Sequence, residues 1–242
     1  MAVSIDGDGG DPASPEPESP DPPAFASPGG RPPPRTARGV RTRAALVAAA
    51  RSVFERKGFL DARLLDITRE AQCSAGSFYT YFDSKEEILA AVLGEAQEEM
   101  LHPGTERVAA DDDPAAVVAA SNRAYFEAYR RNARLMALLE QVAQIDPEIA
   151  DLRRRRAAAF VERNARSIAD LQRAGRADAE VDPMLASEAL SAMVSRLAYG
   201  HFVGRSAGAA SLPGPGDAEF EALVFTATRL WVNALGLDGA RP

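Results

Sequence analysis

The sequence predicts an all-α protein of about nine helices, with an N-terminal three-helix domain followed by a larger helical domain. Beyond residue 38, apolar residues recur at three- and four-residue steps, the period of an amphipathic helix. No sustained alternation of polar and apolar residues indicates a strand. Aspartate caps free N–H groups, and proline at the first helical position has none to satisfy. Three pairs therefore mark helix starts: Asp113-Pro114, Asp146-Pro147 and Asp182-Pro183.

The acidic and proline-rich composition of residues 1–38 predicts a disordered tail, because such a segment cannot bury a hydrophobic core. Six acids and no Lys or Arg fall in residues 1–30, whereas residues 31–57 carry eight bases and one acid. The net charge of −7 therefore hides a basic zone of the kind that binds nucleic acid. Two interpretations of the tail stay open: a solvated segment without a role, or one that folds back on the basic zone and weakens nonspecific DNA binding.

The composition sets the broad class of protein. With 46% hydrophobic residues among 242, the chain can bury a sizeable core. Its single cysteine, Cys73, excludes an internal disulfide and fits a reducing compartment. No run of 18 apolar residues predicts a membrane span, and the acidic start is unlike a secretory signal. We therefore expect a cytoplasmic protein without a membrane partner.

The first two helices are expected over residues 40–57 and 64–71, and Gly58 is expected to stop the first. The apolar stripe of the first helix is Leu46, Val47, Ala50, Val53 and Phe54. The side chains that can pack the second helix on the first are Leu64, Leu65, Ile67 and Ala71.

Residues 74–87 are the most informative segment. Ser74 is expected to cap a helix over 75–81, in which Phe78 and Phe82 turn inward. Ser84 then caps a helix over 85–102, with Glu87 at the spacing of a capping box. A short helix that exposes small and hydroxyl side chains at its start fits a DNA major groove. The sequence thus predicts a helix-turn-helix over about residues 63–82.

The remaining helices are expected over residues 114–131, 133–144, 147–174, 183–206 and 217–236. Asn132 is a weaker start signal than the Asp-Pro pairs. Three glycines are plausible helix stops: Gly175, Gly208 and Gly236.

Several of these motifs together resemble the TetR-type family of transcriptional regulators. They are Gly58-Phe59, Asp66-Ile67, Ala71, the run Ser74 to Phe82, and Ser84-Lys85-Glu86. The resemblance covers about 60 residues, 40–100. It implies a DNA-binding domain over 39–100, and a domain over 101–238 that binds a small ligand and pairs two subunits.

Carried over residue by residue, the resemblance implies DNA contact by Ser74, Ala75, Gly76, Ser77, Tyr79, Thr80, Tyr81 and Lys85. Tyr79 and Lys85 correspond to phosphate contacts. Taken alone, both tyrosines would be surface aromatics packed on the first helix. The flanking pattern favours DNA for Tyr79 and leaves Tyr81 open. Lys85 alone would be a solvated charge, and a nearby phosphate would offset its unfavourable place at a helix start.

The chain departs from the family pattern at two places. Arg63 stands where a capping Thr or Ser is usual, and it adds a cation to the expected DNA face. Gln72 replaces the usual turn glycine, although Gln tolerates positive φ less well. Arg43, with Arg38 and Arg41, either reaches the DNA as an N-terminal arm or is a loose solvated arginine.

Two sets of apolar residues are candidates for the ligand and dimer sites of the second domain. Each residue also suits an ordinary helical core. The expected pocket lining is Tyr125, Phe126, Tyr129, Met136, Leu139, Phe160, Met193 and Leu197, which favours a small apolar ligand. The expected homodimer interface, on the last two helices, is Leu190, Val194, Leu223, Leu230 and Trp231.

Other motifs predict no enzyme, metal site or cofactor. The run Gly204 to Gly208 matches the Gly-x-Ser-x-Gly pattern of hydrolases, but it lacks a preceding strand and a later histidine. Asp111 to Asp113 cannot converge easily on a cation, and only two histidines and one cysteine occur.

The sequence thus predicts a ligand-responsive repressor that binds a near-palindromic operator of double-stranded DNA as a dimer. The helix over 85–102 is the expected transmitter between the two domains. Two alternatives remain: an activator of the same family, and a helical interaction protein that no longer binds DNA.

Overall fold

The computed structural model describes residue 32 and residues 34–101, 113–204 and 216–237, with side chains in the fourth helix described as far as Ala96. Its order is α1 (Ala37–Asp61), α2 (Leu64–Glu70), α3 (Ala75–Tyr81), α4 (Lys85–Leu101), α5 (Pro114–Arg131), α6 (Ala133–Val142), α7 (Pro147–Arg173), α8 (Pro183–Ala198), a π-helical turn η2 (Tyr199–Gly204) and α9 (Asp217–Leu235). The predicted all-α fold is confirmed, since no strand occurs in these ranges.

The helices begin where capping chemistry places them. Asp113, Asp146 and Asp182 each accept a backbone N–H through the side chain and are followed by proline at the first helical position, as predicted. The first helix begins earlier than expected, at Ala37, because the hydroxyl of Thr36 accepts the N–H of Gly39 at 3.1 Å. The proposed tail therefore ends before residue 37, and residues 1–31 and 33 lie outside the described part of the chain.

The helices end at the predicted glycines where these are described. Gly58, Gly175 and Gly236 all have positive φ, which only glycine adopts without steric cost. Gly58, at φ 76° and ψ 169°, interrupts α1, although helical structure resumes as far as Asp61. Gly208 lies outside the described residues.

One expected helix differs in its last turn. Instead of continuing as an α-helix to residue 206, the segment from Tyr199 to Gly204 is a π-helix. This wider turn buries Phe202 and Val203. Phe202 contacts the rings of Phe126, Tyr129 and Phe220, so the aromatic core holds the turn in place.

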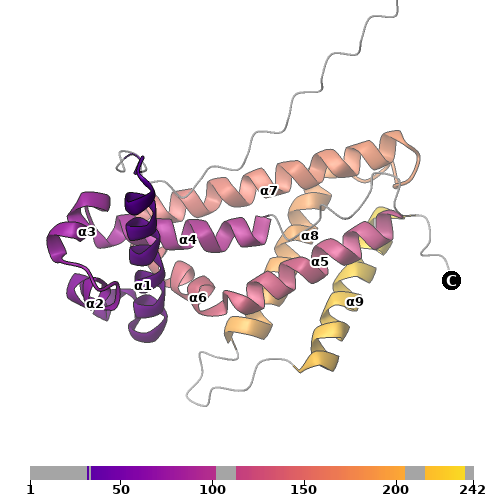
Figure 1. Cartoon of the computed structure of the whole chain (residues 1–242). Helices are drawn as coiled ribbons and strands as arrows, with labels where there is room; N and C mark the ends of the chain where they lie inside the picture. The colour runs from indigo at the N-terminus through magenta and orange to yellow at the C-terminus, as the bar shows by residue number, and fades with distance from the viewer. Residues whose placement is uncertain (1–31, 33, 102–112, 205–215, 238–242) are drawn as a thin grey trace, which may run out of the picture.

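Figure 1 shows two parts joined by long helices. At one end α1, α2 and α3 form a compact trio around a core that includes Leu46, Phe54 and Phe78. α4 leads away from the trio and packs on α1, while α6 packs on α1 from the second part. In that part, α7 pairs with α8 and α5 pairs with α9.

The prediction that Leu65 packs α2 on α1 is wrong, because this side chain is 65% exposed. Ile67, two residues later, is fully buried and does that packing. None of the helices in the described ranges has the length and apolarity needed to cross a membrane.

Candidate nucleic-acid interface

The helix α3 is short, and its local contacts fix which face it exposes. The hydroxyl of Ser74 accepts the N–H of Ser77 at 3.1 Å, so the first turn is capped from its own sequence. Phe78 is fully buried and Phe82 is 1% exposed, which anchors one face in the domain core. The outward side chains are exposed at Ala75, Gly76, Tyr79 and Thr80, with Ser77 half-buried.

The turn before α3 is built at a steric cost. Gln72 has φ 53°, in the left-handed region that disfavours residues with a Cβ. The N–H groups of Gln72 and Cys73 nevertheless bond back to the carbonyls of Arg69 and Thr68, so the turn between α2 and α3 closes. Burial raises the pKa of the Cys73 thiol.

Arg63 does start α2, without the side-chain cap that Ser or Thr would supply. A guanidinium has no acceptor atom, so the Arg63 side chain cannot accept a backbone N–H of the first turn. The hydrogen bond at this helix start is made by a side chain inside the helix instead. The carboxylate of Asp66 accepts the N–H of Arg63 at 3.1 Å. Lys57 also donates to this carboxylate, and both hydrogen bonds lower the pKa of Asp66, the Lys57 contribution being the larger. The Arg63 side chain is exposed.

Two predicted DNA contacts have partners inside the protein. The hydroxyl of Tyr81 lies 3.6 Å from where a Cβ on Gly39 would be, so this ring packs against the start of α1. The guanidinium of Arg43 stacks 5.0 Å from the ring centre of Phe82. Both side chains are half-buried. Both side chains therefore make contacts within the trio.

Lys85 is turned toward the protein. Its ammonium donates to the carbonyls of Phe59 at 2.7 Å and Ala62 at 3.1 Å, and lies 4.4 Å from the ring centre of Phe59. The cation thus binds carbonyl oxygens left free at the end of α1. This contact offsets the unfavourable dipole at the start of α4 without a phosphate.

The basic residues of the domain divide by partner. Arg56 pairs with Glu70, Lys57 with Asp66, and Arg51 with Glu55. Hydrogen bonds lower the pKa of Glu70 to about 2, and the bond from Arg56 contributes more than the bond from Ser52.

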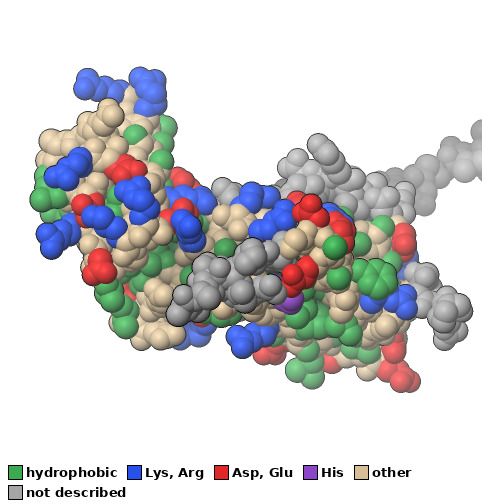
Figure 2. All heavy atoms as spheres, turned by 90° about the horizontal axis from the view of Figure 1, so that it is seen from below, with side chains coloured by type: hydrophobic (Ala, Val, Ile, Leu, Met, Phe, Trp, Pro, Cys, Tyr) green, Lys and Arg blue, Asp and Glu red, His purple; other side chains and the backbone are tan. Residues whose placement is uncertain are grey.

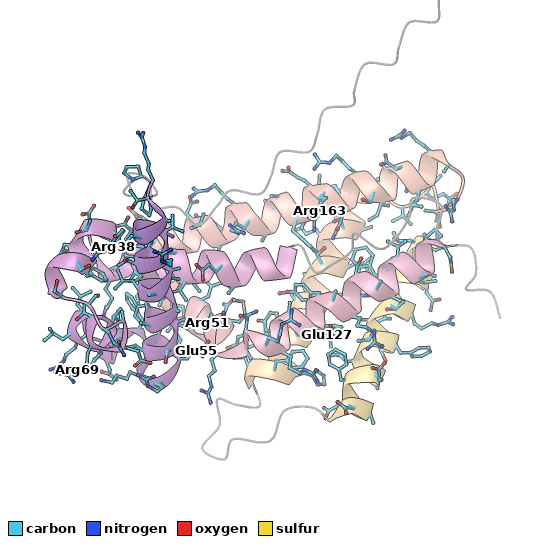
Figure 3. The ribbon with its side chains drawn as sticks, viewed as in Figure 1. Arg38, Arg51, Glu55, Arg69, Glu127 and Arg163 are labelled. Atoms are coloured by element: carbon cyan, nitrogen blue, oxygen red, sulfur yellow. The ribbon has the colours of Figure 1, made fainter. Side chains whose placement is uncertain are left out.

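The other bases of the trio include Arg38, Arg41 and Arg69, which are exposed and have no acidic partner among the described residues. Figure 2 shows Lys and Arg side chains gathered on the end of the molecule formed by α1, α2 and α3. In Figure 3, Arg38 lies near the start of α1, and Arg69 lies on α2 at the outer edge of the trio. Arg69 was not among the DNA contacts expected from the sequence, although it lies in the last turn of α2, shortly before α3.

The predicted pocket residues form a packed aromatic cluster. Tyr125 contacts the rings of Phe126, Tyr129 and Phe160 at centroid distances of 5.8 to 6.5 Å. Phe126, Tyr129, Met136 and Leu139 are buried, while Phe160, Met193 and Leu197 are half-buried. Burial raises the pKa of the Tyr125 hydroxyl, which also bonds Ser195. These side chains fill the space between α5, α6, α7 and α8.

A separate hollow of about 390 Å³ lies on the surface between α7 and the start of α8. It is lined by Glu162, Ala165, Arg166, Ala169, Asp182, Pro183 and Met184. None of the predicted pocket residues lines it.

The predicted dimer residues lie mostly inside the subunit. Leu190, Val194, Leu223 and Trp231 are buried in its core, and only Leu230 is exposed, at 44%. The same two helices expose other large apolar side chains: Met184 and Leu185 on α8, and Phe225 on α9. Most of the residues predicted for the interface thus belong to the inward stripe of these helices, because an apolar residue in a sequence does not reveal whether its own chain or a partner covers it.

Residues 46–92 match the model of the family described as bacterial regulatory proteins, tetR family. The N-terminal domain is a tetR-family domain. It includes most of α1, all of α2 and α3, and the first half of α4. The matched segment contains α3, the capped helix with its buried Phe78, and the match supports a DNA-binding transcriptional regulator.

Relatives agree with this assignment. An uncharacterised HTH-type transcriptional regulator of Bacillus subtilis, YdgC, is 41% identical over 56 residues, which are 23% of this chain and 29% of the relative. The match therefore spans less than a third of that protein.

Solved structures of other proteins share most of the fold. GusR of Salmonella enterica superposes with a TM-score of 0.64 at 20% identity, covering 84% of this chain and 98% of its own. SmeT, the repressor of a Stenotrophomonas maltophilia efflux pump, gives 0.63 at 19% identity, covering 83% and 93%. SmeT has also been solved in complex with triclosan. The family and these relatives are regulators, not enzymes.

Proposed function

We propose that this tetR-type protein is a ligand-responsive repressor in the cytoplasm, which binds a near-palindromic operator as a homodimer and releases it when a small apolar ligand binds. The observation that carries the proposal is the outer face of α3. A helix capped by Ser74 and anchored by Phe78 exposes Tyr79 and Thr80, and the same trio carries exposed arginines that have no acidic partner among the described residues.

The side chains of this face suit a major groove. Ala75 and Gly76 are small, so the start of the helix can approach base edges closely. The hydroxyl of Thr80 donates to the Gly76 carbonyl at 3.2 Å, which leaves its lone pairs and methyl group for bases. Tyr79, 48% exposed, reaches a phosphate, while Arg41 and Arg69, which are exposed in the same trio, supply positive charge.

The homodimer forms through the exposed apolar faces of α8 and α9. Leu185 and Phe225 are each 67% exposed, and Leu230 on α9 is 44% exposed. A second copy is the partner that a two-fold interface requires, because the same face then meets itself. Such a dimer presents two recognition helices roughly 34–36 Å apart, one turn of the duplex.

The ligand acts on the aromatic cluster around Tyr125. The rings of this cluster contact one another in the described residues. An apolar ligand that enters it favours a conformer with a different spacing of the recognition helices. A coupling of about 1–3 kcal/mol weakens DNA binding roughly 5- to 150-fold.

A DNA selection and a mobility-shift assay test the proposal. Sequences selected from a random pool by the wild-type protein should be near-palindromic. The Tyr79→Ala variant should bind them at least about tenfold more weakly, or about 1.4 kcal/mol, because a phosphate contact is lost. Ile145→Ala, which trims another exposed apolar residue far along the chain, is the control and should bind as the wild type does. Equal binding by Tyr79→Ala would contradict the assignment of α3.

A further inference from the structure

A long-range polar contact of defined geometry joins the trio α1 to α3 to the second part of the described structure. The Nη2 of Arg51, on α1, donates to the Oδ1 of Asn132 at 2.7 Å. Asn132 lies 81 residues further along, at the elbow between α5 and α6. Figure 3 shows Arg51 and Glu55 on the side of α1 beside α6.

Both partners of this contact are held in place by their own helices. The Nε of Arg51 donates to the Glu55 carboxylate at 3.1 Å, which fixes the plane of the guanidinium. The Nδ2 of Asn132 donates to the Ala128 carbonyl of α5 at 2.9 Å, which fixes the amide and directs its oxygen toward α1. Asn132 is 1% exposed, so water competes little for the bond.

Asn132 belongs to both helices of the elbow. Its N–H donates to the carbonyls of Ala128 and Tyr129 at the end of α5, and its carbonyl accepts the N–H of Met136 in α6. Asn132, the weaker start signal in the sequence, does precede α6, and its side-chain oxygen accepts from Arg51 instead of capping the helix. A shift of α5 or α6 therefore moves the Oδ1 of Asn132, which accepts the hydrogen bond from Arg51.

The rest of the trio follows α1 as a unit. Lys85, at the start of α4, donates to carbonyls at the end of α1. Arg56 of α1 forms an ion pair with Glu70 of α2. Apolar contacts between α1 and α6 have no preferred direction, whereas a hydrogen bond does. Arg51 therefore adds a directional contact between α1 and the elbow.

We propose that the Arg51–Asn132 bond is a positioning device that fixes the separation and angle of the two recognition helices, and so the half-site spacing that the dimer accepts. The inference rests on the proposed function, because it presupposes a dimer that binds two half-sites. Arg51 does not touch DNA in this proposal. It acts through the orientation of α1.

The test compares binding to three DNA duplexes made from the sequence that the wild-type protein selects. One carries the selected operator, one has a single base pair inserted between the half-sites, and one contains a single half-site. An inserted pair moves one half-site by about 3.4 Å and rotates it around the helix axis. Wild-type protein should discriminate strongly between the first two duplexes.

Arg51→Met should lower that discrimination about tenfold while leaving half-site affinity within about twofold of wild type. Arg56→Met is the matched control: it breaks an ion pair of the same helix, but within the trio, and should keep the wild-type discrimination. Asn132→Ala is a second variant with the same expected result. The double variant Arg51→Met/Asn132→Ala should discriminate between the duplexes as well as either single variant does, because each substitution removes the same hydrogen bond.

Unchanged discrimination in folded Arg51→Met and Asn132→Ala overturns the positioning role. An equal loss of half-site affinity also overturns it, because Arg51 would then support the trio itself. If wild-type protein binds none of the duplexes, the proposed function fails instead, and that outcome is distinct from both.

Discussion

At the scale of single residues, the most unusual backbone is at Gln72, which holds the turn between α2 and α3 with φ 53°. A residue with a Cβ pays roughly 1–2 kcal/mol in this region, and glycine does not. We expect Gln72→Gly to stabilise the domain by about 0.5–1 kcal/mol, after allowing for the greater chain entropy of unfolded glycine. Urea unfolding followed by circular dichroism measures this. Gln72→Ala keeps the Cβ, and if it stabilised as much, positive φ would not be the cause.

The Arg56–Glu70 pair gives the protein a specific acid sensitivity. The pKa of Glu70 falls from 4.5 to about 2 on folding, so the unfolded chain binds a proton more readily. The stabilisation is complete above pH 4.5 and is lost as the pH falls from there toward 2. Unfolding midpoints of wild type and Glu70→Gln should therefore differ near neutral pH and converge over that window. If the difference between the two unfolding midpoints stayed constant as the pH fell, the Arg56–Glu70 pair would not be the source of the acid sensitivity.

Several residue roles could be read from sequence because their partners are close along the chain. Ser74, Asp146 and Asp182 cap helices two or three residues away, so spacing alone identifies them. The Arg51–Asn132 bond could not be found in this way, because its partners are 81 residues apart. Nor could the inward direction of Lys85, which depends on how α1 and α4 cross.

At the scale of helices, Lys85 connects two elements that meet at the edge of the trio. We expect Lys85→Met to destabilise the protein by about 1–2 kcal/mol, because the carbonyls of Phe59 and Ala62 lose a charged donor. Thermal unfolding measures the loss. Lys57→Met removes only a surface ion pair and should cost less than about 1 kcal/mol. If Lys85→Met kept wild-type stability but bound DNA less well, the phosphate contact inferred from the sequence would be the better assignment.

Helix positions were predictable to within a few residues, because capping residues and glycines mark them locally. The range of α3 matched the prediction fully, and α5 did as well. The π-helical turn after α8 was not predictable, since its sequence also suits an α-helix. It forms where Phe202 can reach three other rings, which is a property of the assembled core.

At the scale of the whole molecule, subunit pairing can be tested on its exposed surface. We expect Phe225→Glu to raise the dimer dissociation constant at least about 100-fold, since it would bury an unpaired charge in the interface. Sedimentation velocity measures the mass of the species in solution. Ile145→Glu places the same charge on a residue of similar exposure outside α8 and α9, and should remain dimeric. A dimeric Phe225→Glu protein would move the interface elsewhere.

The arrangement of the two parts could be expected only in outline from the sequence. The division into a DNA-binding trio and a helical remainder followed from motifs at residues 58–87. The assignment of apolar residues to core or interface did not follow, and Leu190 and Trp231 proved to be buried within one subunit.

The π-helical turn from Tyr199 to Gly204 also bears on how this chain tolerates insertions and deletions. A π turn accommodates one residue more than an α turn. Loss of a single residue here would let the segment wind as a regular α-helix, and the side chains within the turn would change direction. Phe202 would then leave the rings it meets, whereas the flanking helices could remain intact. Length at this position is thus as constrained as side-chain identity.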